Sequence, residues 1–122
     1  MGRARDRPRH QYDPSVVVAM VLSDERLFEI CELVFSRDDI IHSIDVERCL
    51  GIRQSYAYNL LRRLEKWGVL RGIRDPVNGK LGFRPGKSRA ATLVAEEIRK
   101  RRAGEVEEVI EDVDVLEGEE EQ

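Results

Sequence analysis

Residues 53–70 read RQSYAYNLLRRLEKWGVL and combine basic, aromatic and amide side chains with four leucines. Arginine can donate two hydrogen bonds to the edge of a guanine, and asparagine can pair in the same way with adenine. Lysine and arginine also bind the phosphates of a nucleic-acid backbone. The segment therefore has the chemistry needed to recognise a nucleic acid. The alternative is that its polar residues are only the solvated side of an amphipathic helix.

A helix is predicted from about Gln54 to Trp67, with Gly68 at its C-terminal end, where a left-handed residue is favoured. At about 100° per residue, its apolar side chains form one stripe. This stripe consists of Ala57, Leu60, Leu61 and Leu64. The residues opposite or beside it are polar, and none of them is acidic: Ser55, Tyr58, Asn59, Arg62, Arg63 and Lys66. We predict that the stripe packs in the core and that Trp67 anchors the end of the helix.

The outward residues divide into two kinds of DNA contact. For base readout we predict Ser55, Tyr58, Asn59 and Arg62, because a helix in the major groove presents side chains near its leading end to the base edges. For the DNA backbone we predict Arg53, Tyr56, Arg63 and Lys66, which lie around them. A bidentate contact with the correct base contributes roughly 1–3 kcal/mol of discrimination.

A β-hairpin of about residues 69–74 and 80–84 is predicted after this helix. Its two halves are rich in β-forming residues, and the intervening DPVNG contains both an Asp-Pro and an Asn-Gly turn signal. Four basic residues belong to the hairpin: Arg71, Arg74, Lys80 and Arg84. We expect them to reach the adjacent minor groove or backbone.

Charge is segregated along the chain, although the net charge is only −3. Residues 48–89 hold eleven bases and two acids, whereas residues 13–47 hold two bases and nine acids. Residues 105–122 hold ten acids and no base. A localised basic block is typical of a surface that binds a polyanion. Solvated charges that happen to cluster are the alternative.

Several shorter signals outline the rest of the domain. Asp13 followed by Pro14 predicts the start of a helix, although the valine run that follows is also compatible with a strand. Ser23, Ser43 and Ser88 are candidate N-caps of three further helices. The second of these helices ends at a glycine, residue 51, and the isoleucines at 40 and 41 belong to a strand or a connector.

These elements predict a mainly α fold with a small β-hairpin (α+β). Residues 1–12 are expected to form a flexible basic arm, 13–103 the folded domain and 104–122 an acidic tail. Within the domain, the order of elements is helix, tight turn at 51–53, longer helix and hairpin.

Residues 43–84, SIDVERCLGIRQSYAYNLLRRLEKWGVLRGIRDPVNGKLGFR, resemble the winged helix-turn-helix domains of small prokaryotic and archaeal transcription regulators of the MarR and ArsR kind. The landmarks are Leu50-Gly51-Ile52 at the turn, the apolar stripe, and Gly68-Val69-Leu70 before the wing. The resemblance implies a homodimeric, double-stranded DNA-binding regulator with helix 54–67 in the major groove. Two alternatives remain: a nucleoid-organising or plasmid-partition protein, and a winged-helix module for protein–protein interaction.

The acidic tail has apolar residues at three- and four-residue steps: Val106, Val109, Val113 and Leu116, together with Ile110. This spacing favours a helix that pairs with another copy or with a protein partner. An inert solubilising end and an intramolecular competitor for the basic surface are the alternatives.

The remaining chemistry is sparse. Cys31 and Cys49 form no Cys-x-x-Cys pair, and His10 and His42 complete no zinc-ligand spacing, so buried reduced thiols and no metal are expected. No phosphate loop or nucleophile motif is visible, which predicts neither a cofactor nor an enzyme. The longest apolar run is too short to cross a membrane, so we expect a cytoplasmic protein.

Overall fold

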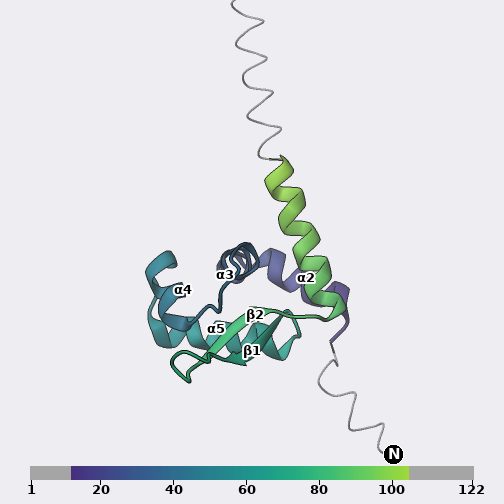
Figure 1. Ribbon diagram of the computed structural model, residues 1–122. Coiled ribbons are helices and arrows are strands. Elements are labelled where there is room, and N and C mark those ends of the chain that lie inside the picture. Colours follow the sequence, from purple (N-terminus) through teal and green to yellow (C-terminus); the bar gives the residue numbers. More distant parts are fainter. Residues whose placement is uncertain (1–11, 105–122) are drawn as a thin grey trace, which may run out of the picture.

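The computed structural model describes residues 12–104 of the chain. Within this range there are five helices and one antiparallel hairpin, with the hairpin packed over α3 and α5 (Figure 1). None of the helices described is long and apolar enough to cross a bilayer. The architecture confirms the predicted fold class, which was mainly helical with a small hairpin.

α2, Pro14–Ser23, begins where the sequence predicted a helix. The Asp13 carboxylate accepts hydrogen bonds from the hydroxyl of Ser15 (2.7 Å) and from its backbone N–H (2.9 Å). These bonds favour the ionised carboxylate and hold the pKa of Asp13 below its ordinary value. Because Pro14 occupies the first turn, its missing N–H leaves no helical bond unmade. The valine run is therefore helical, and the strand alternative is wrong.

α3, Glu25–Ser36, is capped by Asp24 and not by Ser23 as predicted. The Asp24 carboxylate accepts hydrogen bonds from the backbone N–H groups of Arg26 (3.0 Å) and Leu27 (3.2 Å). Ser23 instead ends α2, and its hydroxyl donates to a carbonyl of that helix (3.1 Å). Ser23 and Asp24 are adjacent residues that can each cap a helix. The carboxylate of Asp24 has the further advantage that it interacts favourably with the positive end of the helix dipole.

α4, Ser43–Leu50, is capped by His42, so the prediction of a Ser43 cap is also wrong. The reason is Asp45, in the first turn of the helix, whose carboxylate accepts a hydrogen bond from the backbone N–H of His42 (2.8 Å). An acid at this position satisfies a donor that the helix cannot satisfy. The Ser43 hydroxyl accepts a hydrogen bond from the side chain of Gln54 instead (3.1 Å).

α5 covers Gln54–Lys66. The turn that separates it from α4 begins at Gly51, as predicted. Gly51 has φ of 72°, a left-handed conformation in which a side chain is strained. Gly68, which follows the C-terminal end of α5, also has a left-handed conformation, with φ of 85°. Both glycines therefore fix where one element stops and the next can change direction.

The hairpin consists of β1, Leu70–Arg74, and β2, Leu81–Pro85, with Gly72 opposite Phe83. On its other edge β2 makes a short bridge with Ile41, through two backbone hydrogen bonds between Ile41 and Phe83 of 3.0 and 2.8 Å. Residues 40 and 41, predicted to form a strand or a connector, thus form a connector with one strand-like residue, Ile41. It fixes the hairpin to the residues between α3 and α4.

A further helix covers residues 89–104 and extends away from the other elements (Figure 1). Ser88 caps it as predicted, because its hydroxyl accepts a hydrogen bond from the backbone N–H of Ala91 (3.1 Å). The same hydroxyl donates to the carbonyl of Gly68 (2.6 Å), which ties the helix to the end of α5.

The core lies between α2, α3, α5, the hairpin and the base of helix 89–104. Its largest fully buried side chains are Phe83, Leu27, Ile30, Ile41, Leu60, Leu61, Leu64 and Leu70. Cys31 is buried among them, and burial raises the pKa of its thiol well above the ordinary value. Cys49, on α4, is exposed, so the prediction that both thiols are buried is wrong for this residue. Its neighbour Val46, three residues earlier on the helix, takes the inward position instead.

Candidate nucleic-acid interface

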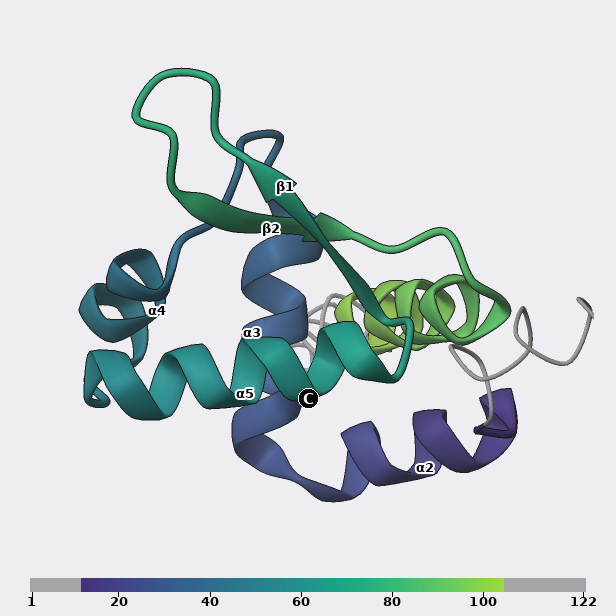
Figure 2. The same cartoon turned by 90° about the horizontal axis from the view of Figure 1, so that it is seen from below.

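α5 separates its apolar and polar side chains in the way the helical spacing predicted. The stripe of Ala57, Leu60, Leu61 and Leu64 is at most 2% exposed. On and just before this helix, the residues predicted to contact DNA are all exposed: Arg53, Ser55, Tyr56, Tyr58, Asn59, Arg62, Arg63 and Lys66. In Figure 2, α5 crosses in front of α3, with the hairpin on one side and α2 on the other. One continuous side of this helix is therefore available to a ligand.

Arg62 is held on this surface by two neighbours on the same helix. Its Nε atom lies 2.8 Å from a carboxylate oxygen of Glu65. One terminal nitrogen donates a hydrogen bond to the hydroxyl of Tyr58 (2.8 Å), and the guanidinium lies 5.7 Å from the centre of the Tyr58 ring. The Tyr58 bond and then the Glu65 charge raise the pKa of Arg62 above its ordinary value. Arg62 is thus oriented before any ligand arrives.

The hairpin contacts both residues that hold Arg62, which are Tyr58 and Glu65. The Tyr58 ring packs edge-on against Phe83, with ring centroids 6.4 Å apart. Glu65 lies over β1 at Gly72, where a Cβ atom would stand only 2.6 Å from a carboxylate oxygen of Glu65. Glu65 was not predicted to belong to the site, although its spacing of three residues from Arg62 is that of a helical ion pair. The role of Gly72 depends on a contact between helix and strand that no local pattern shows.

An open groove passes along the C-terminal half of α5, between this helix, β1 and residues 86–88. Five basic residues line it: Arg62, Arg63, Lys66, Arg71 and Lys87. Glu65 is the one acidic residue among the described residues that line it. Concave surfaces with one sign of charge concentrate the field and attract ions of the opposite sign. The groove therefore suits an anionic polymer that follows α5.

Trp67 and Tyr12 also line this groove. The two rings meet edge-on with centroids 6.3 Å apart, and Trp67 also packs against the core. These contacts agree with the predicted anchoring role of Trp67.

The basic residues of the hairpin that were predicted to contact DNA differ in their exposure and in their hydrogen-bond partners. Arg74 and Lys80 are exposed beside the turn, where Arg74 donates to the carbonyl of Gly79 (2.6 Å). Arg71 is partly buried, and its Nε atom donates to the carbonyl of Pro85 (3.2 Å). The most exposed large apolar side chain of the described residues is at this turn, because Val77 is 90% exposed. The tip is thus mixed, with basic residues around an apolar one.

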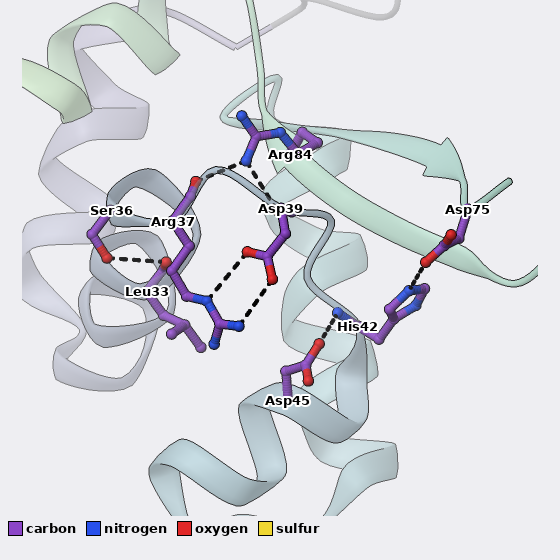
Figure 3. A network of polar contacts seen from close by, with 8 residues as sticks. All are labelled: Leu33, Ser36, Arg37, Asp39, His42, Asp45, Asp75 and Arg84. Carbon is purple, nitrogen blue, oxygen red and sulfur yellow. Dashed lines mark hydrogen bonds and ion pairs between the residues drawn. The ribbon is translucent and has the colours of Figure 1, made fainter. Parts of the chain in front are cut away.

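Arg84 lies on the side of the hairpin that faces the α3–α4 connection (Figure 3). One of its terminal nitrogens donates to the backbone carbonyls of Arg37 (2.8 Å) and Asp39 (2.9 Å). The side chains of those two residues also form a two-point ion pair, with nitrogen–oxygen distances of 3.2 and 3.0 Å. The structure therefore separates Arg84 from the groove and gives it an internal partner.

His42 joins the same connection to the other end of the hairpin (Figure 3). Its Nε2 atom lies 2.8 Å from a carboxylate oxygen of Asp75, and its Nδ1 atom lies 3.1 Å from the carbonyl oxygen of Leu81. The two side chains are only 16% and 15% exposed. The hydrogen bond from His42 holds the pKa of Asp75 below its ordinary value. Because 33 residues separate them, no local spacing could reveal the pair.

Comparison with known proteins adds evidence on the fold. No protein-family model matches the sequence, and no curated protein is detectably similar to it. Among solved structures, the adhesin competence repressor AdcR of Streptococcus pyogenes matches at 20% identity and a TM-score of 0.58, over 74% of this chain and 63% of that one. The transcriptional regulator Tm0710 of Thermotoga maritima matches at 22% identity and a TM-score of 0.57, over 82% of this chain and 72% of that one.

The chain has a winged helix-turn-helix fold. The resemblance predicted from residues 43–84 is thereby confirmed at the level of fold. In the terms of that fold, α4 and α5 are the helix-turn-helix, and β1 and β2 are the wing. The chain covers less than two thirds of the length of the repressor, so the remainder of that protein has no counterpart in the match.

Some predictions fall on residues outside the range 12–104. The predicted pairing residues Val106, Val109, Val113 and Leu116 lie there, as does nearly all of the predicted basic arm. Within the described range of the winged helix, no group of three or more histidine, cysteine or acidic side chains is placed to hold a metal ion.

Proposed function

We propose that this winged-helix chain is a DNA-binding transcription regulator that inserts α5 into the major groove. The observation that carries the proposal is the exposed side of α5, whose cations continue onto β1 and residues 86–88 around one groove. An α-helix fits the major groove of B-DNA, and such a fold presents its second helix there. The solved structures that match include two proteins described as a repressor and a transcriptional regulator.

The side chains on α5 have separate roles in this proposal. Arg62, Asn59 and Ser55 face the base edges, because they lie opposite the buried stripe. Arg53, Tyr56, Arg63 and Lys66 bind phosphates on either side of the groove. The wing tip, with Arg74 and Lys80, lies along the adjacent backbone or minor groove.

We also propose that the regulator acts as a homodimer on a pseudo-palindromic site. A single helix of this size reads only a few base pairs, so two copies are needed for a site of useful length. Two features support an interface formed by the N- and C-terminal helices. Val16 on α2 is 51% exposed, and helix 89–104 extends beyond the body of the domain (Figure 1). The apolar residues predicted at 106–116 would continue that interface.

A salt-dependent binding titration tests the function. If about six phosphates are contacted, the logarithm of the affinity should fall against the logarithm of the salt concentration with a slope of about −5. Reversing one groove charge with Lys66→Glu should weaken binding to any duplex by about tenfold or more, because it removes a cation and adds a repulsive charge. A slope near zero would exclude the DNA-binding function.

The matched control is Arg26→Glu on α3. It makes the same change of charge on a residue whose partner, Glu29, belongs to a surface pair away from the groove. We expect this variant to bind DNA with nearly the affinity of the wild type. Equal losses in the two variants would mean that overall charge, and not the α5 surface, determines binding.

Footprints on genomic DNA distinguish the two kinds of DNA-binding protein. Sparse footprints would favour a regulator, whereas continuous ones would favour a nucleoid-organising protein.

A further inference from the structure

The one acidic residue of α5, Glu65, lies within its basic surface and pairs with Arg62. We propose that Glu65 and Tyr58 are positioning residues that hold Arg62 ready to read a guanine in the major groove. This inference rests on the proposed function and deepens it, because it names the base and the residues that determine its selection.

The hydrogen-bond donors of Arg62 fit this role. A guanidinium carries five N–H groups. The Nε atom forms an ion pair with a carboxylate oxygen of Glu65, 2.8 Å away, and one N–H of a terminal nitrogen is donated to the hydroxyl of Tyr58. Three N–H groups of the two terminal nitrogens therefore remain. The side chain of Arg62 is 51% exposed, so it is accessible to a ligand.

Two adjacent terminal donors are complementary to one base in particular. Guanine presents two acceptors, N7 and O6, on its major-groove edge. Adenine presents one acceptor beside a donor, cytosine presents a donor, and thymine presents one acceptor beside a methyl group, so none of these three bases can accept two hydrogen bonds from Arg62. A guanine is therefore the expected partner of Arg62.

Glu65 has no evident reason to be in the groove unless it orders Arg62. A carboxylate beside five cations repels phosphates and reduces affinity for every DNA sequence. An unrestrained arginine can also adopt many conformations, and binding must then select one of them. Restraint by Glu65 and Tyr58 removes that cost for the one geometry that matches guanine. The acid thus lowers general affinity and raises discrimination.

The wing keeps Glu65 in place by leaving room for it. Gly72 of β1 allows the carboxylate to lie where any side chain would collide with it. Tyr58 is held by its contact with Phe83, which is fully buried. Both positioning residues are therefore fixed from the same strand pair.

The experiment first selects bound duplexes from a random pool with the wild-type chain, then measures affinity for the selected site and for single-base variants of it. The wild type should prefer guanine at one position by about 5- to 150-fold, the range of a bidentate arginine–guanine contact. Glu65→Gln should reduce this preference at least about threefold, while affinity for random-sequence duplex stays the same or rises.

Glu29→Gln is the matched control for charge. Glu29 pairs with Arg26 at the same three-residue spacing, and its side chain is 35% exposed, close to the 31% of Glu65. This control removes an identical charge from α3, away from the groove, and should leave the guanine preference unchanged.

Gly72→Ala tests position without changing any charge. The added methyl group would displace the flexible end of Glu65 from its place over β1, with only a small adjustment of Leu81. It should lower the guanine preference as Glu65→Gln does. Tyr58→Phe, which keeps the ring on Phe83 and removes the hydroxyl, should act in the same direction. Thermal unfolding of each variant establishes that the chain remains folded.

The possible results separate the inference from the function. If Glu65→Gln and Gly72→Ala bind DNA but keep the full guanine preference, the positioning role is wrong and DNA binding stands. If the wild type enriches no guanine that depends on Arg62, the readout assignment is wrong. If the wild type binds no duplex at any salt concentration, the proposed function itself fails.

Discussion

The two edges of the wing differ in what their basic side chains contact. Along β2, Arg84 donates to backbone carbonyls of the α3–α4 connection, and His42 links that connection to the turn. Along β1, Arg71 lines the open groove beside Lys66 of α5. One edge therefore attaches the wing to the domain, and the other forms part of the proposed binding surface.

The difference shows that a basic residue in a basic segment is not equivalent to a DNA contact. All four wing residues were predicted to contact DNA because they share a predominantly basic segment. The structure gives Arg84 two internal acceptors, so its use on a phosphate would leave those carbonyls without their partner. Whether an arginine is available depends on acceptors that lie about 45 residues away in the chain.

Phe83 joins the two edges, and its replacement should have the largest effect. It is fully buried, bridges to Ile41 on one side and contacts Tyr58 on the other. Phe83→Ala should lower the free energy of unfolding by about 3–5 kcal/mol, from lost burial and the cavity that remains. Urea unfolding followed by circular dichroism measures this change.

Phe83→Leu is the corresponding control, because it keeps most of the apolar volume and removes only the aromatic contact with Tyr58. We expect it to cost less stability than Phe83→Ala and to weaken the guanine preference. A small loss of stability in Phe83→Ala, below about 1 kcal/mol, would contradict the central position of this residue.

Arg84→Met and Lys66→Met test the division between the two edges directly. Both changes remove one positive charge and keep an apolar stem. Arg84→Met should lower the free energy of unfolding by about 1–3 kcal/mol, because two carbonyls lose a charged donor, and should leave the salt slope of DNA binding unchanged. Lys66→Met should change stability by less than about 0.5 kcal/mol and reduce the steepness of the salt slope by about 0.9.

The measurements are chemical unfolding for stability and fluorescence anisotropy for binding at several salt concentrations. Asp39→Asn adds a reference for surface pairs, since Arg37 and Asp39 are both well exposed. Such pairs contribute about 0–1 kcal/mol. If Arg84→Met reduced the salt slope as much as Lys66→Met, both edges of the wing would contact DNA and the comparison would fail.

The sequence predicted those features that local spacing determines. The buried stripe of α5 follows from helical periodicity, and the hairpin follows from the turn residues at 75–79. The two wrong N-caps were each one residue from the true ones, because Ser23 and Ser43 stand beside residues that compete for the same role. Such competition is settled by hydrogen-bond geometry that composition does not contain.

Other features that the sequence did not predict depend on contacts between distant segments. Glu65 over Gly72, Arg84 on the α3–α4 connection and His42 against Asp75 each join two elements. None of these pairs produces a periodic pattern, and each becomes visible only when the hairpin is placed against the helices. Helical spacing therefore identifies the exposed side of α5 but not the wing contacts that hold Tyr58 and Glu65 in place.

Asp75→Asn tests how the attached edge of the wing responds to pH. Of the variants considered, it should change the free energy of unfolding least at neutral pH. The hydrogen bond from His42 lowers the pKa of Asp75 in the folded state, below its ordinary value of about 3.9. The unfolded chain therefore takes up this proton more readily than the folded chain does. The stabilisation is complete above the unfolded pKa and is lost as the pH falls through the folded pKa.

We expect the free energy of unfolding of the wild type to fall more steeply than that of Asp75→Asn between about pH 5 and pH 2. Urea unfolding at half-unit steps of pH measures both curves. The amide oxygen that Asp75→Asn introduces can still accept the hydrogen bond from the ring of His42, so the variant should keep the wing in place at neutral pH. Because Asp75 adjoins Arg74 and Lys80 of the proposed wing contact, the loss of its charge should leave DNA affinity at neutral pH the same or slightly higher. Parallel curves would show that the Asp75 carboxylate does not hold the wing, and the attachment would then depend on Arg84 and the Ile41–Phe83 bridge.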